Sequence, residues 1–166
     1  MRTIALRLRP GADLKAELLA LAAREGVRAG WVLTCVGSLS EARLRLAGGT
    51  EHATWQGLFE IVVLTGTLSQ DGSHLHLAVA DDQGRTVGGH LAEGCTVRTT
   101  AEVVVAADDR LVFAREHDLP PATTSWWSAS ATRKTRDGHR VLAAWVHSTW
   151  ATTGLWRYAP EKRRLD

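Results

Sequence analysis

Apolar residues recur at every second position along most of the first 118 residues, and this alternation limits the chain to a fold built mainly from strands. Successive side chains of a strand point to opposite faces of a sheet, so each alternating segment predicts a strand with one buried face. Tight turns rich in Gly and Asp separate the segments, which favours antiparallel pairing. Strands are predicted over residues 2–9, 29–36, 39–46, 59–68, 74–80, 87–91, 96–106 and 111–115.

A helix interrupts these strands near the start of the chain. Asp13 is a typical N-cap residue, leucines at helical spacing follow it, and Gly26 ends the segment. The pattern predicts an α+β fold, in which one or two α-helices flank a largely antiparallel β-sheet. The sequence contains neither an apolar run of ~18 residues nor the apolar core of a signal peptide, so we expect a cytoplasmic protein without membrane contact.

Charge and aromatic content change near residue 118. Residues 1–118 carry 12 Lys+Arg and 15 Asp+Glu, whereas residues 119–166 carry 8 and 3, in line with the overall net charge of +2. Five of the seven Trp also lie in the last 48 residues. We therefore predict two parts, a domain over 1–118 and a basic, Trp-rich extension over 119–166.

Three histidines have the spacing of a metal site. His74 and His76 occupy positions i and i+2 of a predicted strand, so both imidazoles point to one face. The turn at 81–84 would fold the next strand back and place His90 beside them. Three imidazoles with an open fourth position form the ligand set of a water-bearing zinc site. On spacing alone, ordinary surface or packed histidines are the alternative.

A few other residues bear on this chemistry. Cys95 is a candidate fourth ligand, although a buried or free thiol is the more ordinary role for either of two cysteines. Glu60 and Glu102 each interrupt an apolar strand, so each carboxylate either faces solvent or belongs to a functional pocket. His52 and His117 lie outside the pattern and are expected at the surface.

Seven segments occur in an order and at spacings that resemble one known family. They are Arg7–Leu14, Gly37–Leu39, Gly57–Ile61, Leu64–Leu68, His74–Leu77, Gly88–Leu91 and Thr99–Val103. That family is the PPC domain (plants and prokaryotes conserved), which follows AT-hook DNA-binding motifs in plants and usually stands alone in bacteria and archaea. The resemblance extends over residues 2–118, about 70% of the chain.

The resemblance implies a PPC-like antiparallel sheet flanked by helix and assembled as a homotrimer. It also implies that His74, His76 and His90 bind a metal, with zinc as the expected ion, near a subunit boundary. The family has no established enzymatic activity, and its plant members regulate transcription through self-association and partner contacts. Their Gly-x-Phe-Glu-Ile segment is implicated in those contacts. The corresponding positions here are Gly57, Phe59, Glu60 and Ile61.

The sequence departs from the family in two places. Arg7–Pro10 superficially resembles the Arg-Gly-Arg-Pro core of an AT-hook, but Leu8 would clash in a narrow minor groove and belongs to the first strand. The family's ending is matched only as far as Asp118. One set of codons for Pro120–Trp127, read one base out of frame, spells Ala-Thr-Gly-Tyr-Asp-Glu-Leu-Val, which resembles that ending. We therefore hypothesise that residues from about 119 onward are frame-shifted relative to the ancestral gene.

Two interpretations of the extension are open. In the first, it is a poorly specified addition without function. In the second, it is a nucleic-acid arm, in which the basic runs Arg133–Arg136 and Lys162–Arg164 contact phosphates and Trp side chains stack on bases.

Three functional hypotheses follow. The first is a non-enzymatic, trimeric PPC-type protein with a three-histidine zinc site and a regulatory or interaction role, in which DNA or a DNA-binding protein is a further candidate partner. The second is a zinc-dependent enzyme acting on a small molecule, with Glu60 or Glu102 as the base. The third is a structural domain whose histidines are simply packed.

Overall fold

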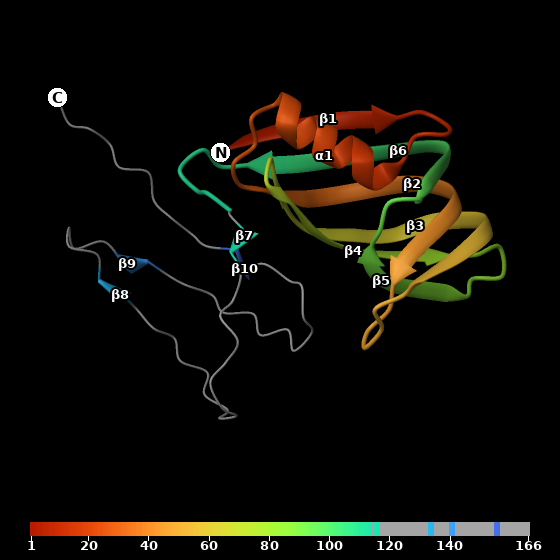
Figure 1. The fold of residues 1–166 in the computed structure, drawn as a ribbon. Coiled ribbons are helices and arrows are strands. Elements are labelled where there is room, and N and C mark those ends of the chain that lie inside the picture. Colours follow the sequence, from red (N-terminus) through yellow and green to blue (C-terminus); the bar gives the residue numbers. More distant parts are fainter. Residues whose placement is uncertain (114, 117–132, 135–139, 142–154, 157–166) are drawn as a thin grey trace. The chain divides into compact units, whose positions relative to one another are not determined.

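The computed structural model describes residues 1–113, 115–116, 133–134, 140–141 and 155–156 (Figure 1). The chain divides into two compact units, residues 1–109 and residues 110–166. In the second unit, the described residues form two pairs of two-residue strands: β7 (Arg115–Glu116) with β10 (Leu155–Trp156), and β8 (Arg133–Lys134) with β9 (Arg140–Val141). Most of the predicted extension, including the second basic run, lies outside the described residues.

The first unit is one six-stranded sheet with a helix packed on it. Its strands pair in the order β1-β6-β2-β3-β4-β5, and every pairing is antiparallel. The last strand, β5, also pairs with the end of β2, so this side of the sheet closes on itself. The mostly antiparallel α+β fold is therefore confirmed, with one helix among the described residues. The elements are β1 (Arg2–Leu8), α1 (Leu14–Arg24), β2 (Gly30–Arg45), β3 (His52–Ser69), β4 (Gly72–Ala80), β5 (Thr86–Leu91) and β6 (Thr96–Ala107).

Two of the predicted strands are one strand in the structure. The segments 29–36 and 39–46 form the continuous 16-residue β2, and the expected stop at Gly37-Ser38 does not end it. The pairing with β6 instead shifts register at this point, between Gly37 and Leu39. Such an irregularity bends a strand without breaking it. Glycine here marks a bend in the sheet, and the sequence pattern could not separate a bend from a turn.

The last predicted strand is mostly absent. Leu111, Val112 and Phe113 have no regular structure, and strand β7 contains only Arg115 and Glu116. Short apolar runs have little periodicity from which to distinguish a strand from an irregular segment.

Helix α1 covers one face of the sheet and supplies part of the core. The Asp13 carboxylate accepts a hydrogen bond from the backbone N–H of Ala16 at 2.8 Å, which caps the helix as predicted. The helix buries Leu14, Leu18 and Leu21 against the sheet, next to β3 and β6. Among the described residues, no helix is long and apolar enough to cross a membrane.

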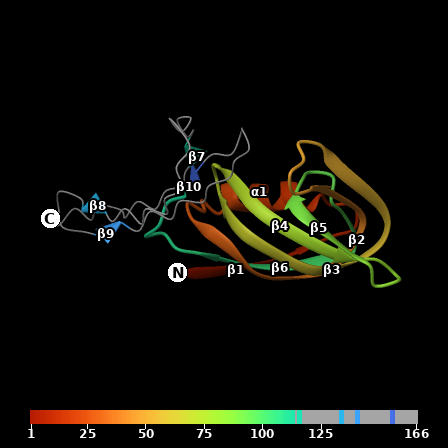
Figure 2. The ribbon, with the colours of Figure 1, turned by 90° about the horizontal axis from the view of Figure 1, so that it is seen from below.

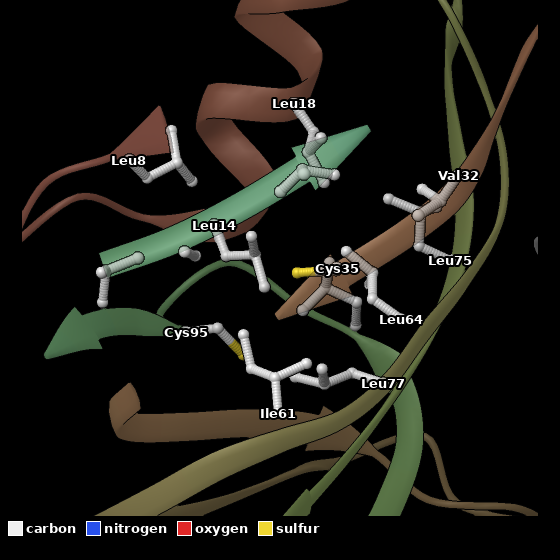
Figure 3. Close-up of a cluster of buried hydrophobic side chains, with 14 of the residues drawn as sticks. Leu8, Leu14, Leu18, Val32, Cys35, Ile61, Leu64, Leu75, Leu77 and Cys95 are labelled. Carbon is white, nitrogen blue, oxygen red and sulfur yellow. The ribbon is translucent and has the colours of Figure 1, made fainter. Parts of the chain in front are cut away.

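The core lies between α1 and the face of the sheet that it covers, here called the inner face (Figure 3). Leucine, isoleucine and valine side chains from the helix and from the strands meet there. Cys35 and Cys95 lie in this cluster as free thiols, and burial raises the pKa of the Cys35 thiol to about 12 and that of Cys95 to about 11. The predicted buried thiols are confirmed.

The opposite, outer face of the sheet carries aliphatic side chains in solvent. We call this set the outer patch; its members are Leu33, Val36, Leu58, Val62 and Val63, each between 45% and 60% exposed. The pairs Trp31↔Thr67 and Ser38↔Glu60 have the same register, and in this register Val36 of β2 lies level with Val62 of β3. The outer patch is therefore continuous across both strands. Clustered exposed aliphatic residues of this kind are typical of an interaction surface.

Candidate metal centre

The three predicted histidines meet on the outer face, where β4 and β5 lie side by side (Figure 2). His74 and His76 project from β4, and His76 lies directly opposite His90 on β5. The turn between the two strands is tied by Asp81, whose carboxylate accepts the backbone N–H of Arg85 at 2.8 Å and contacts its Nε at 2.7 Å. This local turn brings His90 back to the first pair, as the sequence predicted.

One pair of ring nitrogens has the spacing that a tetrahedral ion needs, and the third histidine lies near that pair. The Nε2 atoms of His74 and His76 lie 3.3 Å apart, and one ring nitrogen from each histidine lies within 4.8 Å of the others. Two nitrogens on a tetrahedral zinc, each about 2.0–2.1 Å from it, are separated by roughly 3.3 Å. The rings of His76 and His90 are steeply inclined, 78° apart with centroids at 4.4 Å, so their edges converge. The residues present fit a zinc ion.

The electrostatic setting keeps His90 neutral. Burial, followed by the positive charge of Arg45 and of the two other histidines, lowers the pKa of His90 to about 4. At neutral pH its imidazole therefore carries a free lone pair, which is the form that binds a metal. His74 and His76 are exposed and His90 is half-buried, so one side of the cluster faces solvent in this chain.

Two glycines allow the strands to approach closely enough to form the cluster. Gly66 on β3 lies between the residues opposite His74 and His76, and it has a φ of +129° that side chains rarely adopt. Gly89 on β5 passes so near β2 that a Cβ atom there would lie 2.7 Å from the carbonyl oxygen of Arg45. Glycine at these two positions therefore sets how closely β4 packs against β3, and β5 against β2, on either side of the cluster.

Replacing Gly66 with alanine is expected to destabilise the first unit by at least about 2 kcal/mol and to weaken metal binding. The new Cβ would overlap the carbonyl oxygen of His74 and lie 2.9 Å from the Cα of Leu75, so β3 and β4 would have to separate. Urea unfolding measures the effect. Gly84→Ala is the matched control, because Gly84 also has a positive φ, +78°, but nothing lies within 4 Å of a Cβ there. Equal losses in the two variants would contradict the close-approach argument.

The other candidate residues lie elsewhere. Cys95 is fully buried on the inner face, and its sulfur contacts the backbone of Arg43, so it is not a fourth ligand. Glu60 lies opposite Ala80 on β4. Ala80 is four residues from His76 on the same strand, so Glu60 is displaced from His76 by about 13 Å along the strand direction. Glu102 belongs to β6, where its carboxylate lies 3.6 Å from the Nε atom of Arg7 on β1; these two strands are at the other end of the strand order from β4. Among the described residues, the candidate metal-binding group contains the three histidines and no carboxylate.

The predicted partner-contact segment lies on β3, next to Leu58 and Val62 of the outer patch. Phe59 and Ile61 are 7% exposed and belong to the core, whereas Gly57 and Glu60 face solvent. Their role in partner contact stays a prediction. His52 is at the surface as expected, and His117 lies outside the described residues.

Sequence reasoning missed three neighbours of the cluster. Thr65 lies directly opposite His76, Thr67 opposite His74, and Arg45 opposite His90. The two threonines could have been found by pairing the β3 and β4 segments in register. Arg45 had no such signal, because its position depends on the pairing of β5 with the distant end of β2.

The fold and site together define an α+β protein with a curled antiparallel sheet, one helix and an outer-face histidine cluster. The chain belongs to the Plants and Prokaryotes Conserved domain family (PCC, also written PPC), whose model matches residues 1–108. Among curated proteins it is similar to the bifunctional protein GlmU of Synechococcus sp. (strain JA-3-3Ab), with 53% identity over 123 residues. The match covers 74% of this chain and 20% of that protein, so the chain spans about a fifth of this relative's length.

Solved structures share the fold. A hypothetical protein from Salmonella cholerae-suis is 44% identical, with a TM-score of 0.69, over 73% of this chain and 86% of that one. A proposed DNA-binding protein from Bacteroides thetaiotaomicron is 23% identical (TM-score 0.63, 70% and 84% covered). A metal-containing protein from Archaeoglobus fulgidus is 22% identical (TM-score 0.58, 71% and 87% covered). The last two likenesses show the fold alone.

Proposed function

We propose that this chain is a non-enzymatic, self-associating PCC-family protein in which His74, His76 and His90 hold one zinc ion. The observation that carries the proposal is the convergence of three ring nitrogens within 4.8 Å on one face of adjacent strands. Neutral imidazoles are ordinary zinc ligands, and the 3.3 Å spacing of two of them matches a tetrahedral edge. The fold relative from Archaeoglobus fulgidus, which is a metal-containing protein, supports a metal site in this fold.

A bound ion would have a structural effect. It would connect β4 to β5 at the point where β5 turns back to β2, and so stabilise the closed side of the sheet. Elemental analysis of the purified full chain, after zinc addition and desalting, tests the proposal. We expect one zinc per chain, and a chain that retains none would contradict it.

Self-association is the second part of the proposal. The outer patch exposes five aliphatic side chains on β2 and β3, and Glu60 of the predicted partner-contact segment lies among them. We propose that further copies of this chain cover the patch, in the homotrimer that the family resemblance implies. Burial of these side chains would remove their apolar surface from water, and this is the usual driving force for association.

The regulatory partner is proposed to be DNA or a DNA-binding protein. The fold relative from Bacteroides thetaiotaomicron, which is a proposed DNA-binding protein, supports an association with DNA. Residues 1–118 carry 12 Lys+Arg against 15 Asp+Glu, and this charge favours contact through a protein rather than with phosphates. A steep loss of DNA duplex binding with rising salt would instead indicate direct phosphate contact by the basic extension. We propose that this extension begins at residue 119, after a domain over residues 1–118. A cytoplasmic location likewise stays a prediction.

The zinc-dependent enzyme is the alternative function. The solvent-facing side of the histidine cluster favours it, because three protein ligands leave one position for water or substrate. The two carboxylates that were predicted as the base of such an enzyme, Glu60 and Glu102, are both remote from His76. We therefore place the interaction role first.

A further inference from the structure

The histidine cluster is part of a longer row of polar side chains on the outer face. Thr65 of β3 is directly opposite His76, His76 is opposite His90, and His90 is opposite Arg45 of β2. Directly opposed residues on antiparallel strands place their side chains on the same face, with Cβ atoms about 4.5–5.5 Å apart. The row therefore runs from the hydroxyl of Thr65 through the imidazoles to the guanidinium of Arg45, and His52 of β3 lies beyond it, directly opposite Arg45.

A second hydroxyl lies beside this row. Thr67 is directly opposite His74, one step along the same two strands. Both threonines are on the outer face, and a hydroxyl can donate a hydrogen bond to any oxygen placed over the cluster.

The charge of the row is uncompensated. Neutral imidazoles bring no negative charge to a divalent ion, and Arg45 adds a permanent positive charge next to it. Arg2, Arg7, Arg24 and Arg85 each form an ion pair with a carboxylate. The guanidinium of Arg45 has instead one long contact, 3.5 Å, to the carbonyl oxygen of Gly49. Its remaining donors are available for an anion.

We propose that Arg45, Thr65 and Thr67 form, around the metal position, a binding subsite for a small oxyanion, either a carboxylate or a phosphate. One oxygen of the anion would occupy the ligand position that the three histidines leave open, and a second would accept hydrogen bonds from Arg45. The planar fork of arginine matches the two oxygens of these groups, which makes it suited to this role. The subsite rests on the proposed function, because it requires the metal.

Anion binding to the full chain loaded with Co²⁺ in place of zinc tests the subsite. The visible absorption of cobalt responds to a change in its ligands, so it reports metal binding and anion binding separately. Inorganic phosphate and acetate are titrated in separate arms, which distinguishes the two kinds of oxyanion. We expect a spectral change with at least one of them, and at least tenfold weaker anion affinity in Arg45→Met, which binds cobalt at least as tightly as wild type because a positive charge beside the ion is removed.

Two further variants sharpen the result. Arg43→Met is the matched control, because Arg43 is an exposed arginine two residues earlier on β2, opposite Thr54 and away from the histidines; it is expected to leave anion affinity unchanged. Arg45→Lys keeps the charge but loses the fork, and an intermediate affinity is expected. Cobalt binding without an anion response, or equal anion affinity in wild type and Arg45→Met, would overturn the subsite alone. Absence of cobalt binding by the wild-type chain would overturn the proposed function as well.

Discussion

Replacing His76 with alanine is expected to lower the zinc affinity of the chain by more than about 100-fold, because a direct ligand contributes more than the 10–100-fold effect of a residue that only orients one. His76 is central to the cluster: its Nε2 lies 3.3 Å from that of His74, and His90 is directly opposite it. Without it, two imidazoles remain, one on each of two strands. Competition with a chromophoric zinc chelator at neutral pH measures the affinity.

The matched control is His52→Ala. His52 is an exposed histidine at the start of β3, opposite Arg45 but on the side of β2 away from His90. Its loss is expected to leave zinc affinity unchanged, which separates the specific cluster from a general effect of imidazoles on the surface. Equal zinc affinities for wild type and His76→Ala would contradict a three-histidine site.

Zinc should also stabilise the fold through the same ligands. A ligand that binds only the folded chain, at a thousand times its Kd, raises the free energy of unfolding by about 4 kcal/mol. We expect this increase in wild type and in His52→Ala, and at most about 1.4 kcal/mol in His76→Ala, because a 100-fold weaker affinity leaves the same zinc concentration at only about ten times Kd. Urea unfolding with and without zinc thus provides a readout of the site that needs no assumption about activity.

The histidine cluster was accessible from the sequence because its geometry is local. His74 and His76 share a face by the period of the strand, and the turn that returns His90 lies within the thirteen residues between His76 and His90. Arg45 is separated from His90 by 45 positions in the chain, and it reaches the cluster only because β5 pairs with the end of β2. No local pattern carries that information.

The alternation pattern of β3 assigns Val63 and Leu64 to the wrong faces of the sheet, for a different reason. Strict alternation along β3 would place Phe59, Ile61 and Val63 on one face and Leu64 on the other. The pairing with β4 shifts between Ile61 and Val63, so Val63 is 45% exposed and Leu64 is 3% exposed. A single irregularity reverses the faces of all residues after it. The outer patch therefore contains Val63 in place of Leu64, which strict alternation would have exposed.

Replacing Val62 with aspartate is expected to convert the assembly into single chains. Val62 is 58% exposed and lies level with Val36, near the middle of the outer patch. In the proposed homotrimer it would be buried, and an unpaired carboxylate buried at each interface costs several kcal/mol. Sedimentation at micromolar concentration should give three times the chain mass for wild type and one chain mass for the variant.

Two measurements decide whether such a change reports the interface or a loss of folding. Leu46→Asp introduces the same charge at an exposed leucine just after β2 and outside the patch, and it should sediment like wild type. Zinc affinity of Val62→Asp should stay within about threefold of wild type, because all three histidines belong to one chain and the aspartate does not touch them. A Val62→Asp protein that still sediments as a trimer would place the interface elsewhere. A variant that loses both association and zinc would instead indicate a loss of folding and would not report on the interface.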